Sequence, residues 1–214
     1  MKIVAIIPIK KNSERIKKKN FKIINGKPFY RFLLDKLKKC NFDEVYIDSD
    51  SEIIKNYCNK NNFKFISRLK KLSGNNANGN DLINYHQKII NADVYFQLFV
   101  TAPLLSVSTI NKCIDIMKKN NKFDSILTSR SLYTWFWFKK NPVNYNPKIL
   151  PRSQDCKPVI QETTGLYGIR KAALKKFKAR IGNKPYFYDV PYQEALDIDE
   201  LIDLQLLKFL IKNK

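Results

Sequence analysis

The sequence lacks any apolar run of about 18 residues, the length that a membrane-spanning helix requires. Its first apolar stretch, MKIVAIIPIKK, is too short for a secretory signal peptide, and no small-residue cleavage site follows it. The four cysteines (Cys40, Cys58, Cys113 and Cys156) lie far apart without a CxxC pair, which argues against a zinc site and a disulfide framework. We therefore expect a cytoplasmic protein with no membrane partner.

Glycine and histidine are also scarce. The 6 glycines form neither the GxGxxG spacing of a dinucleotide site nor the GxxxxGK[ST] spacing of a P-loop. The single histidine, His86, gives no basis for a Ser-His-Asp or Cys-His nucleophile. It lies in an amphipathic pattern, and we expect it to serve the core or the surface rather than catalysis.

Positive charge is abundant but dispersed. The chain of 214 residues carries 40 Lys and Arg against 19 Asp and Glu, a net charge of +21. Lysine and asparagine are scattered along the whole chain rather than gathered on one element, so nucleic-acid binding is the less favoured interpretation. The hydrophobic content of 44% fits a folded globule, and the length suits a single domain over residues 1–214.

Strand and helix patterns alternate along most of the chain. Residues 2–9 (KIVAIIPI) are almost continuously aliphatic, as in a strand buried on both faces of a parallel sheet. The alternation predicts an α/β fold with a mainly parallel sheet. We expect strands over 2–9, 44–50, 63–68, 93–105, 123–130, 163–169 and 185–190, and helices over 28–39, 51–61, 81–91, 108–120, 170–179 and 199–212.

Residues 131–162 interrupt this alternation. The segment contains both tryptophans and several prolines and has no helical period. We expect an inserted, irregular lid or dimerisation segment here. Its WFWF stretch (135–138) suits lid or dimer packing better than base stacking.

A cationic loop follows the first predicted strand, in IIPIKKNSERIKKKNFKIINGKPF (residues 6–29). Ligands of open α/β sheets bind at the carboxyl ends of the strands, so this loop is well placed for a site. Its cationic, amide and hydroxyl donors suit the oxygens of a triphosphate and of a pyrophosphate leaving group. These donors are Lys10, Asn12, Ser13, Arg15 and Lys19. An ordinary solvated basic loop is the alternative.

A pair of aspartates lies in QEALDIDELID. Residues two apart in a strand point to the same face, so Asp197 and Asp199 could converge on a hard cation such as Mg²⁺. The alternative is a helix cap, because Asp199 and Glu200 precede a predicted helix. Both roles can hold together.

Several stretches, in order, resemble the acylneuraminate cytidylyltransferases, the CMP-sialic acid synthetases. The opening loop resembles the motif of that family, with a Ser-x-Arg, a Lys-Asn pair and an Asn-Gly-x-Pro turn. QLFVTAPLL is similar to its Gln-Leu-x-x-Thr-Ser-Pro-Leu segment, and LDIDELID to its metal-binding Asp-x-Asp. LPRSQ and TTGLYGI occupy the places of a Pro-Arg stretch and a glycine-containing strand.

This resemblance implies a three-layer, Rossmann-like nucleotidyltransferase fold with helices on both faces of the sheet. It also implies the family reaction, in which a sugar hydroxyl attacks the α-phosphate of CTP and pyrophosphate leaves. The family members are typically homodimers that exchange an inserted segment. A Mg²⁺-dependent transferase acting on CTP and an acidic sugar is therefore our expectation.

The same resemblance implies a role for each matching residue. Arg15, Lys19 and Asp199 are expected to be catalytic, with Asp199 able to take the hydroxyl proton, and Asp197 and Asp199 to hold Mg²⁺. Arg152 is expected to meet the carboxylate of the acid sugar. The nucleotide is expected to lie against Lys10, Asn12, Ser13, Asn20, Arg68, Ala77, Gly79 and Gln97, and the sugar against Gln97, Lys139, Arg152 and Tyr167.

Some positions depart from the family pattern. Lys10 stands for a usual Arg, Glu14 for a common Lys and Ala102 for a Ser, while Gly168 takes the place of a sugar-contacting Tyr, with Tyr167 one position earlier. The departures on the acceptor side leave the sugar open between sialic acid and a legionaminic- or pseudaminic-type acid. A nucleotidyltransferase with another NTP or acceptor, a glycosyltransferase with its own Asp-x-Asp, and a basic nucleic-acid-binding protein remain as alternatives in descending order.

Overall fold

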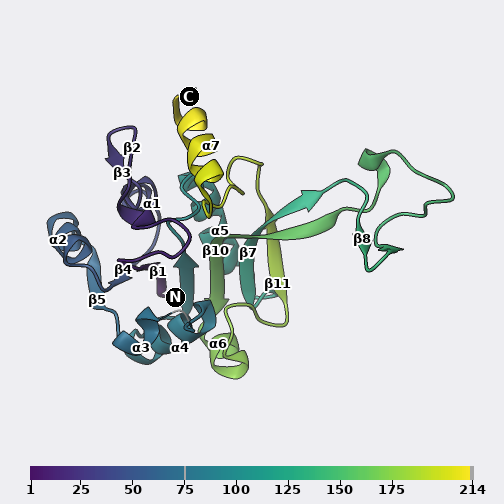
Figure 1. The fold of residues 1–214 in the computed structure, drawn as a ribbon. Helices are drawn as coiled ribbons and strands as arrows, with labels where there is room; N and C mark the ends of the chain where they lie inside the picture. The colour runs from purple at the N-terminus through teal and green to yellow at the C-terminus, as the bar shows by residue number, and fades with distance from the viewer. Residues whose placement is uncertain (75, 213–214) are drawn as a thin grey trace.

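The computed structural model describes residues 1–74 and 76–212, and a seven-stranded sheet forms its centre (Figure 1). The strand order is β11-β7-β10-β6-β1-β4-β5. β10 runs antiparallel to both of its neighbours, and the other pairs are parallel. The strands are β1 (Ile3–Ile9), β4 (Glu44–Ser49), β5 (Lys64–Ser67), β6 (Val94–Leu98), β7 (Ser125–Leu132), β10 (Val159–Arg170) and β11 (Pro185–Asp189). The predicted, mainly parallel α/β sheet is confirmed.

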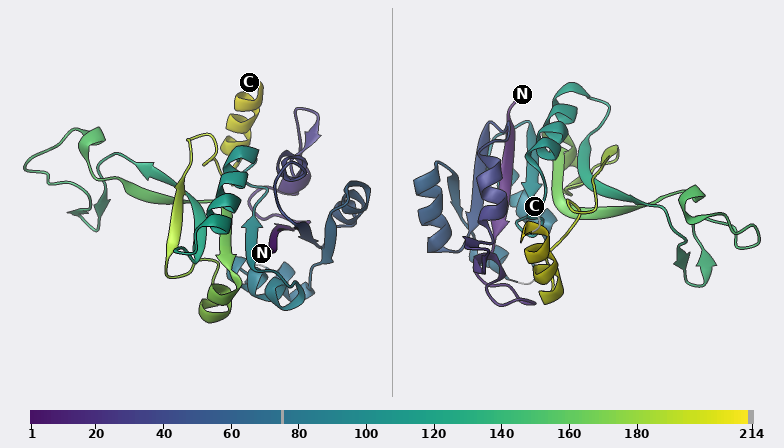
Figure 2. Two further views of the ribbon diagram at one scale, coloured as in Figure 1. Left: turned by 180° about the vertical axis from the view of Figure 1, so that it is seen from behind. Right: turned by 90° about the horizontal axis from the view of Figure 1, so that it is seen from above.

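Helices cover both faces of the sheet (Figures 1 and 2). Along β1, Ile3, Ala5, Ile7 and Ile9 pack in one apolar cluster, and Val4 and Ile6 pack in another, because successive strand residues face opposite sides. The first cluster includes side chains of α1 (Arg31–Leu37), α2 (Glu52–Asn61) and α5 (Val107–Lys119); the second includes those of α4 (Gly79–Ile89) and α6 (Lys171–Phe177). This two-sided burial explains why the sequence of β1 is aliphatic throughout.

Shorter elements complete the chain. The NGKPF turn closes a small hairpin of β2 (Ile23–Ile24) and β3 (Lys27–Pro28), in which Asn25 (φ 47°) and Gly26 (φ 75°) adopt the left-handed conformation of a tight hairpin turn. The remaining elements are η1 (Lys19–Phe21), α3 (Lys70–Ser73), β8 (Trp137–Phe138), β9 (Asn141–Pro142), η2 (Ser153–Asp155) and α7 (Leu201–Lys212). In the part of the chain that the structure describes, no helix is long and apolar enough to cross a membrane.

The interruption predicted at 131–162 is an arm that projects from the sheet (Figures 1 and 2). Its base is more regular than the sequence indicated, because β7 and β10 stay paired out to Leu132 and Val159. Beyond that pair, residues 133–158 hold only the two-residue strands β8 and β9 and the short helix η2. Large apolar side chains of the arm are exposed, among them Trp137, Phe138, Ile149 and Leu150.

A buried polar network links β4, β5 and α4. The Asp48 carboxylate, at the end of β4, accepts a hydrogen bond from Arg68 Nε at 3.1 Å and lies 2.9 Å from His86 Nε2. Arg68 Nη2 also donates to the Asp48 carbonyl at 3.0 Å. All three side chains are almost completely excluded from solvent. His86 is thus a core residue, as predicted, and its carboxylate partner fixes an arginine just after β5.

Removing the Asp48 carboxylate should destabilise the folded protein, because the buried guanidinium of Arg68 would lose its counter-ion. We expect Asp48→Ala to lower the free energy of unfolding by about 3–5 kcal/mol, measured by urea denaturation. The exposed pair of Glu52 with Lys55 provides the control, and Glu52→Ala should change the same quantity by about 1 kcal/mol or less. Equal losses in the two variants would contradict a stabilising role for the network.

Candidate active site

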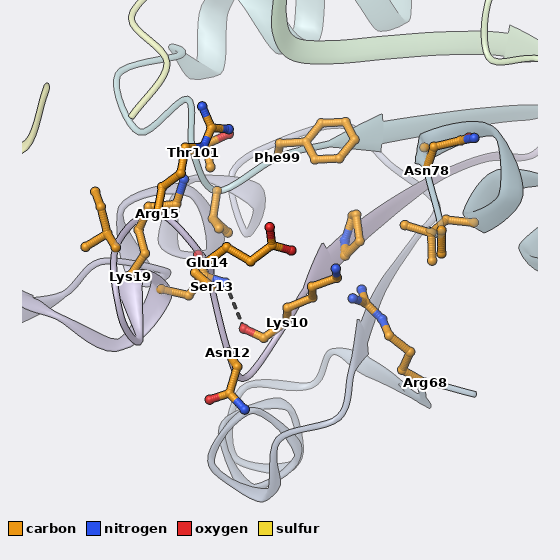
Figure 3. Close-up of a pocket in the computed structure, with 17 residues that line it drawn as sticks. Lys10, Asn12, Ser13, Glu14, Arg15, Lys19, Arg68, Asn78, Phe99 and Thr101 are labelled. Atoms are coloured by element: carbon orange, nitrogen blue, oxygen red, sulfur yellow. Dashed lines mark hydrogen bonds between the residues drawn. The ribbon is translucent and has the colours of Figure 1, made fainter. Parts of the chain in front are cut away.

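A cavity of ≈ 340 Å³ lies where β1, β5 and β6 end (Figure 3). The loop after β1 forms one wall, the start of α4 a second, and Phe99–Thr101, which follow β6, a third. This is the edge of a parallel sheet at which ligands bind. Of the residues predicted to contact nucleotide or phosphate, those lining it are Lys10, Asn12, Ser13, Arg15, Lys19, Asn20, Arg68, Ala77 and Gly79.

The cationic loop is braced from within and from outside. The buried Asn20 donates from Nδ2 to the Lys10 carbonyl at 2.9 Å, the bond drawn in Figure 3. Lys10 Nζ donates to the Gly74 carbonyl at 2.9 Å, and the Lys11 amide donates to Asp50 Oδ1 at 2.7 Å. These bonds fix the backbone of the loop while leaving Asn12 and Arg15 exposed.

Asp199 joins the loop to the segment that precedes α7. Arg15 Nη2 lies 2.9 Å and Lys19 Nζ 3.1 Å from Asp199 Oδ1. The Lys19 ammonium also donates to the Ile198 carbonyl at 2.5 Å. The Lys19 side chain is 9% exposed and that of Arg15 64% exposed, so one cation is built into the wall and the other faces solvent. The structure therefore brings together the two regions that the sequence singled out.

The capping role expected of Asp199 belongs to a different aspartate. Asp203 Oδ2 accepts from the backbone amides of Asp199 at 2.8 Å and Glu200 at 2.7 Å. Asp203 lies in the first turn of α7, where a carboxylate is favoured by the helix dipole. The Asp199 carboxylate is left to the two cations.

Asp197 is a half-buried carboxylate whose buried oxygen Oδ1 is unused. The segment is not a strand, but the buried Ile198 donates its amide to the Thr101 carbonyl at 2.8 Å and separates the two aspartates. Burial raises the pKa of Asp197 above its ordinary value, and the Asp199 charge adds to this, while the hydroxyls of Thr101 and Thr164 oppose it. Asp197 Oδ1 has no hydrogen-bond partner among the described residues.

A cation would fit this pair of carboxylates. No group of three or more His, Cys, Asp or Glu side chains that could hold a metal occurs within residues 1–74 and 76–212. Mg²⁺, however, is commonly held by one or two carboxylates together with substrate phosphates. The unpartnered oxygen of Asp197 and the neighbouring Asp199 supply that donor set.

Gln97 and Tyr167 form a cross-strand pair on the α4 and α6 side of the sheet. Gln97 Nε2 donates to the Gly79 carbonyl at 3.1 Å, whereas its buried Oε1 has no partner in the described chain. A Cβ added at Gly168 would lie 2.7 Å from atoms of Ile126 and Phe96, inside the opposite core. Position 168 therefore faces the core, and Tyr167 lies on the opposite side of the sheet together with Gln97. Neither Gln97 nor Tyr167, both predicted to contact substrate, is among the residues that line the cavity.

Lys139 and Arg152 lie elsewhere, on the arm. Lys139 follows β8 and has a left-handed backbone (φ 46°). Arg152 is paired with Asp155 at 2.7 Å, and its side chain is 74% exposed. Neither residue lines the cavity formed by this chain.

Several residues at or near the cavity were not predicted from the sequence as site candidates. Among those that line it are Glu14, Phe99 and Thr101, all of which lie inside the cationic loop or the QLFVTAPLL stretch. Arg180, from the loop after α6, stacks on Tyr167 with its Cζ 3.7 Å from the ring centroid. No motif marks Arg180 in the sequence.

Comparisons with known proteins identify the family of this chain. N-acylneuraminate cytidylyltransferase A of Danio rerio is 25% identical over 211 residues, covering 94% of this chain and 49% of that protein. This chain thus spans about half the length of that relative. The pseudaminic acid cytidylyltransferase of Campylobacter jejuni is 28% identical over 230 residues, covering 99% of this chain and 97% of the relative.

The fold has a solved counterpart. The structure of a CMP:2-keto-3-deoxy-manno-octonic acid synthetase complexed with CTP superposes with a TM-score of 0.73 at 15% identity, covering 100% of this chain and 99% of that one. The Rossmann-like nucleotidyltransferase fold is thereby confirmed. A family model described as Cytidylyltransferase matches residues 4–214. The resemblance to the acylneuraminate cytidylyltransferases is confirmed with it, and the chain belongs to the cytidylyltransferase family.

Proposed function

We propose that this protein transfers CMP from CTP to a hydroxyl of an acidic sugar of the nonulosonic class and releases pyrophosphate. The reaction would take place in the cytoplasm and would supply the activated sugar for the synthesis of surface glycans. The observation that carries the proposal is the pairing of Arg15 and Lys19, which line the cavity, with Asp199, two residues after the half-buried Asp197. The names of the relatives, which include acylneuraminate and pseudaminic acid cytidylyltransferases, support the class of acceptor.

The triphosphate of CTP would lie along the loop after β1. Lys10, Asn12 and Ser13 would contact its oxygens, and Arg15 and Lys19 would stabilise the charge that develops on the departing pyrophosphate. The cytidine end would lie by Asn20, Arg68, Ala77 and Gly79, and Gln97 would mark the acceptor side. Phosphoryl transfer of this kind depends chiefly on in-line positioning and charge stabilisation, so no protein nucleophile is needed.

Asp197 and Asp199 would hold Mg²⁺ when the nucleotide is bound. The ion would supply positive charge to the phosphate oxygens, which the carboxylates alone would repel. Once the phosphates draw Arg15 and Lys19 away, Asp199 is also placed to accept the proton of the attacking hydroxyl.

A test of the reaction is pyrophosphate release measured with CTP, ATP, GTP and UTP in turn. The acceptors are N-acetylneuraminic acid, pseudaminic acid and 3-deoxy-manno-octulosonic acid, with and without Mg²⁺. We expect turnover with CTP and at least one of the nonulosonic acids, and only in the presence of the ion.

The variant Arg15→Ala tests the role of the cationic loop in this assay. Its side chain is exposed, so its removal should not affect folding. It should lower turnover by orders of magnitude, since one of the charges opposite the leaving group is removed. Equal turnover with all four NTPs, or none with CTP, would rule out the proposed reaction.

The arm supports a homodimer as the working form. Lys139 and Arg152 lie on the arm, which projects away from the sheet, and they do not line the cavity of their own chain. We therefore infer that each arm reaches the acceptor end of the cavity in a second copy. Exposed apolar residues such as Ile149, which is 75% exposed, would be covered in that contact.

This inference predicts a particle of twice the 25.2 kDa chain mass by light scattering coupled to size exclusion. Ile149→Asp should weaken the dimer and lower turnover together, because it places a charge in the contact. Ile53→Asp, at a comparably exposed apolar residue of α2, should change neither. A fully active 25.2 kDa wild-type particle would contradict the exchange of arms.

A further inference from the structure

Next to the cavity, beyond Gly79, lies an arginine that the proposed mechanism has not used. Arg180 comes from the loop between α6 and β11. Its backbone amide donates to Asn80 Oδ1 at 2.9 Å, and Asn84 Nδ2 donates to the Lys178 carbonyl at 2.6 Å. Two bonds therefore fasten this loop to the first turns of α4, the helix whose start lines the cavity.

The Arg180 guanidinium is held flat and partly buried. Its Cζ lies 3.7 Å from the ring centroid of Tyr167, and its Nη2 lies 3.4 Å from Glu162 Oε1. Glu162 also accepts a hydrogen bond from the Tyr167 hydroxyl. The stacked ring fixes the plane of the fork, and the side chain is 25% exposed. Nε and Nη1 make no hydrogen bond to any described residue, so part of the fork remains available.

The free donor Nη1 lies near the same point as the unpartnered oxygen Oε1 of Gln97. A Cβ built at Gly79 would lie 2.7 Å from Arg180 Nη1 and 3.2 Å from Gln97 Oε1. The two polar groups therefore converge at the one position of α4 where a side chain is missing. Gly79 itself lines the cavity, so this point of convergence borders the nucleotide end of the site.

The neighbourhood contains another polar atom without a partner. Asp197 Oδ1 is buried and unpaired within the described residues, as Gln97 Oε1 is. Asp197 interacts electrostatically with Tyr167, and Thr164 lies against Asp197. Buried polar atoms are normally paired, so such a group indicates a subsite completed by a polar ligand.

We propose that Arg180 binds the carboxylate of the acceptor and thereby selects an acidic sugar. This inference rests on the proposed function and assigns the acid recognition to a residue that lies beside the cavity of its own chain. An arginine fork suits a carboxylate better than any other side chain, and Arg180 Nη1 lies near the same point as Gln97 Oε1. Arg152, the residue that the family resemblance implies for this role, lies on the arm and is paired with Asp155, as Arg180 is with Glu162.

The test uses the full chain with N-acetylneuraminic acid and pseudaminic acid, each as the free acid and as the methyl ester. We expect Arg180→Gln to raise the KM for the free acid about 10–100-fold, the range for loss of a charge-assisted hydrogen bond. The KM for CTP should stay within about twofold of the wild-type value. Lys184→Gln, an exposed cation of the same loop, is the matched control for general surface charge and should leave both values unchanged.

The methyl ester separates recognition of the carboxylate from a loss of structure. Wild-type protein should prefer the acid to the ester, and Arg180→Gln should lose that preference. Arg180→Lys, which keeps the charge but not the fork, should retain part of it. Urea midpoints of all variants report whether Arg180 also supports the fold.

Three results would overturn the inference. If Arg180→Gln keeps the preference for the acid and Arg152→Gln loses it, the carboxylate belongs to Arg152 and the proposed function stands. If the Lys184→Gln control behaves like Arg180→Gln, the effect is one of general charge. If the wild-type protein releases pyrophosphate with no acid sugar, the proposed function fails and the assignment of Arg180 fails with it.

Discussion

The contact of Asp199 with Arg15 and Lys19 is the interaction on which the site depends. It joins residues up to 184 positions apart, and it sets the cationic loop after β1 against the segment that leads into α7. The Lys19 ammonium is largely withdrawn from water, so it requires the carboxylate and the Ile198 carbonyl that it contacts. Under the proposed function, Asp199 pairs with the cations that the triphosphate would bind. Binding of the phosphates would then exchange one counter-ion for another and would release a carboxylate near Asp197.

The rest of the fold holds the two ends of the cavity at fixed positions. At one end, Asp48 and His86 fix Arg68 in the core, and at the other, Ile198 is packed with Ile16 and Leu207. The exposed side chains between them, Asn12 and Arg15, belong to a loop whose backbone is braced by Asn20. A rigid frame with a few exposed donors suits a reaction that is accelerated by positioning and by charge. The residues proposed for the acceptor are held differently: Lys139 and Arg152 lie on the arm, whereas Arg180 stacks on Tyr167 beside the cavity of its own chain.

Much of this could be predicted from the sequence because the signals are local. The aliphatic run of β1, the alternation of strands and helices, and the donors of the first loop all depend on adjacent residues. The pairing of Asp199 with the loop followed only from joining two motifs through the resemblance to a family. What the sequence did not reveal depends on contacts between distant segments. The partner of His86, the cap supplied by Asp203, the outward position of Arg152 and the stacking of Arg180 on Tyr167 leave no local pattern. The register of β10 likewise pairs Tyr167 with Gln97 and turns position 168 toward Ile126 and Phe96, and spacing alone does not show this.

The proposed exchange of counter-ions can be tested by calorimetric titration of CTP into wild-type protein and Asp199→Asn, each with and without Mg²⁺. We expect Asp199→Asn to bind CTP without Mg²⁺ about tenfold more tightly than the wild type, because Arg15 and Lys19 are no longer paired with a carboxylate. Mg²⁺ should strengthen CTP binding to the wild type and give the variant little further gain. Asp199→Asn that binds CTP no more tightly than the wild type, and responds to Mg²⁺ to the same extent, would contradict the proposed exchange.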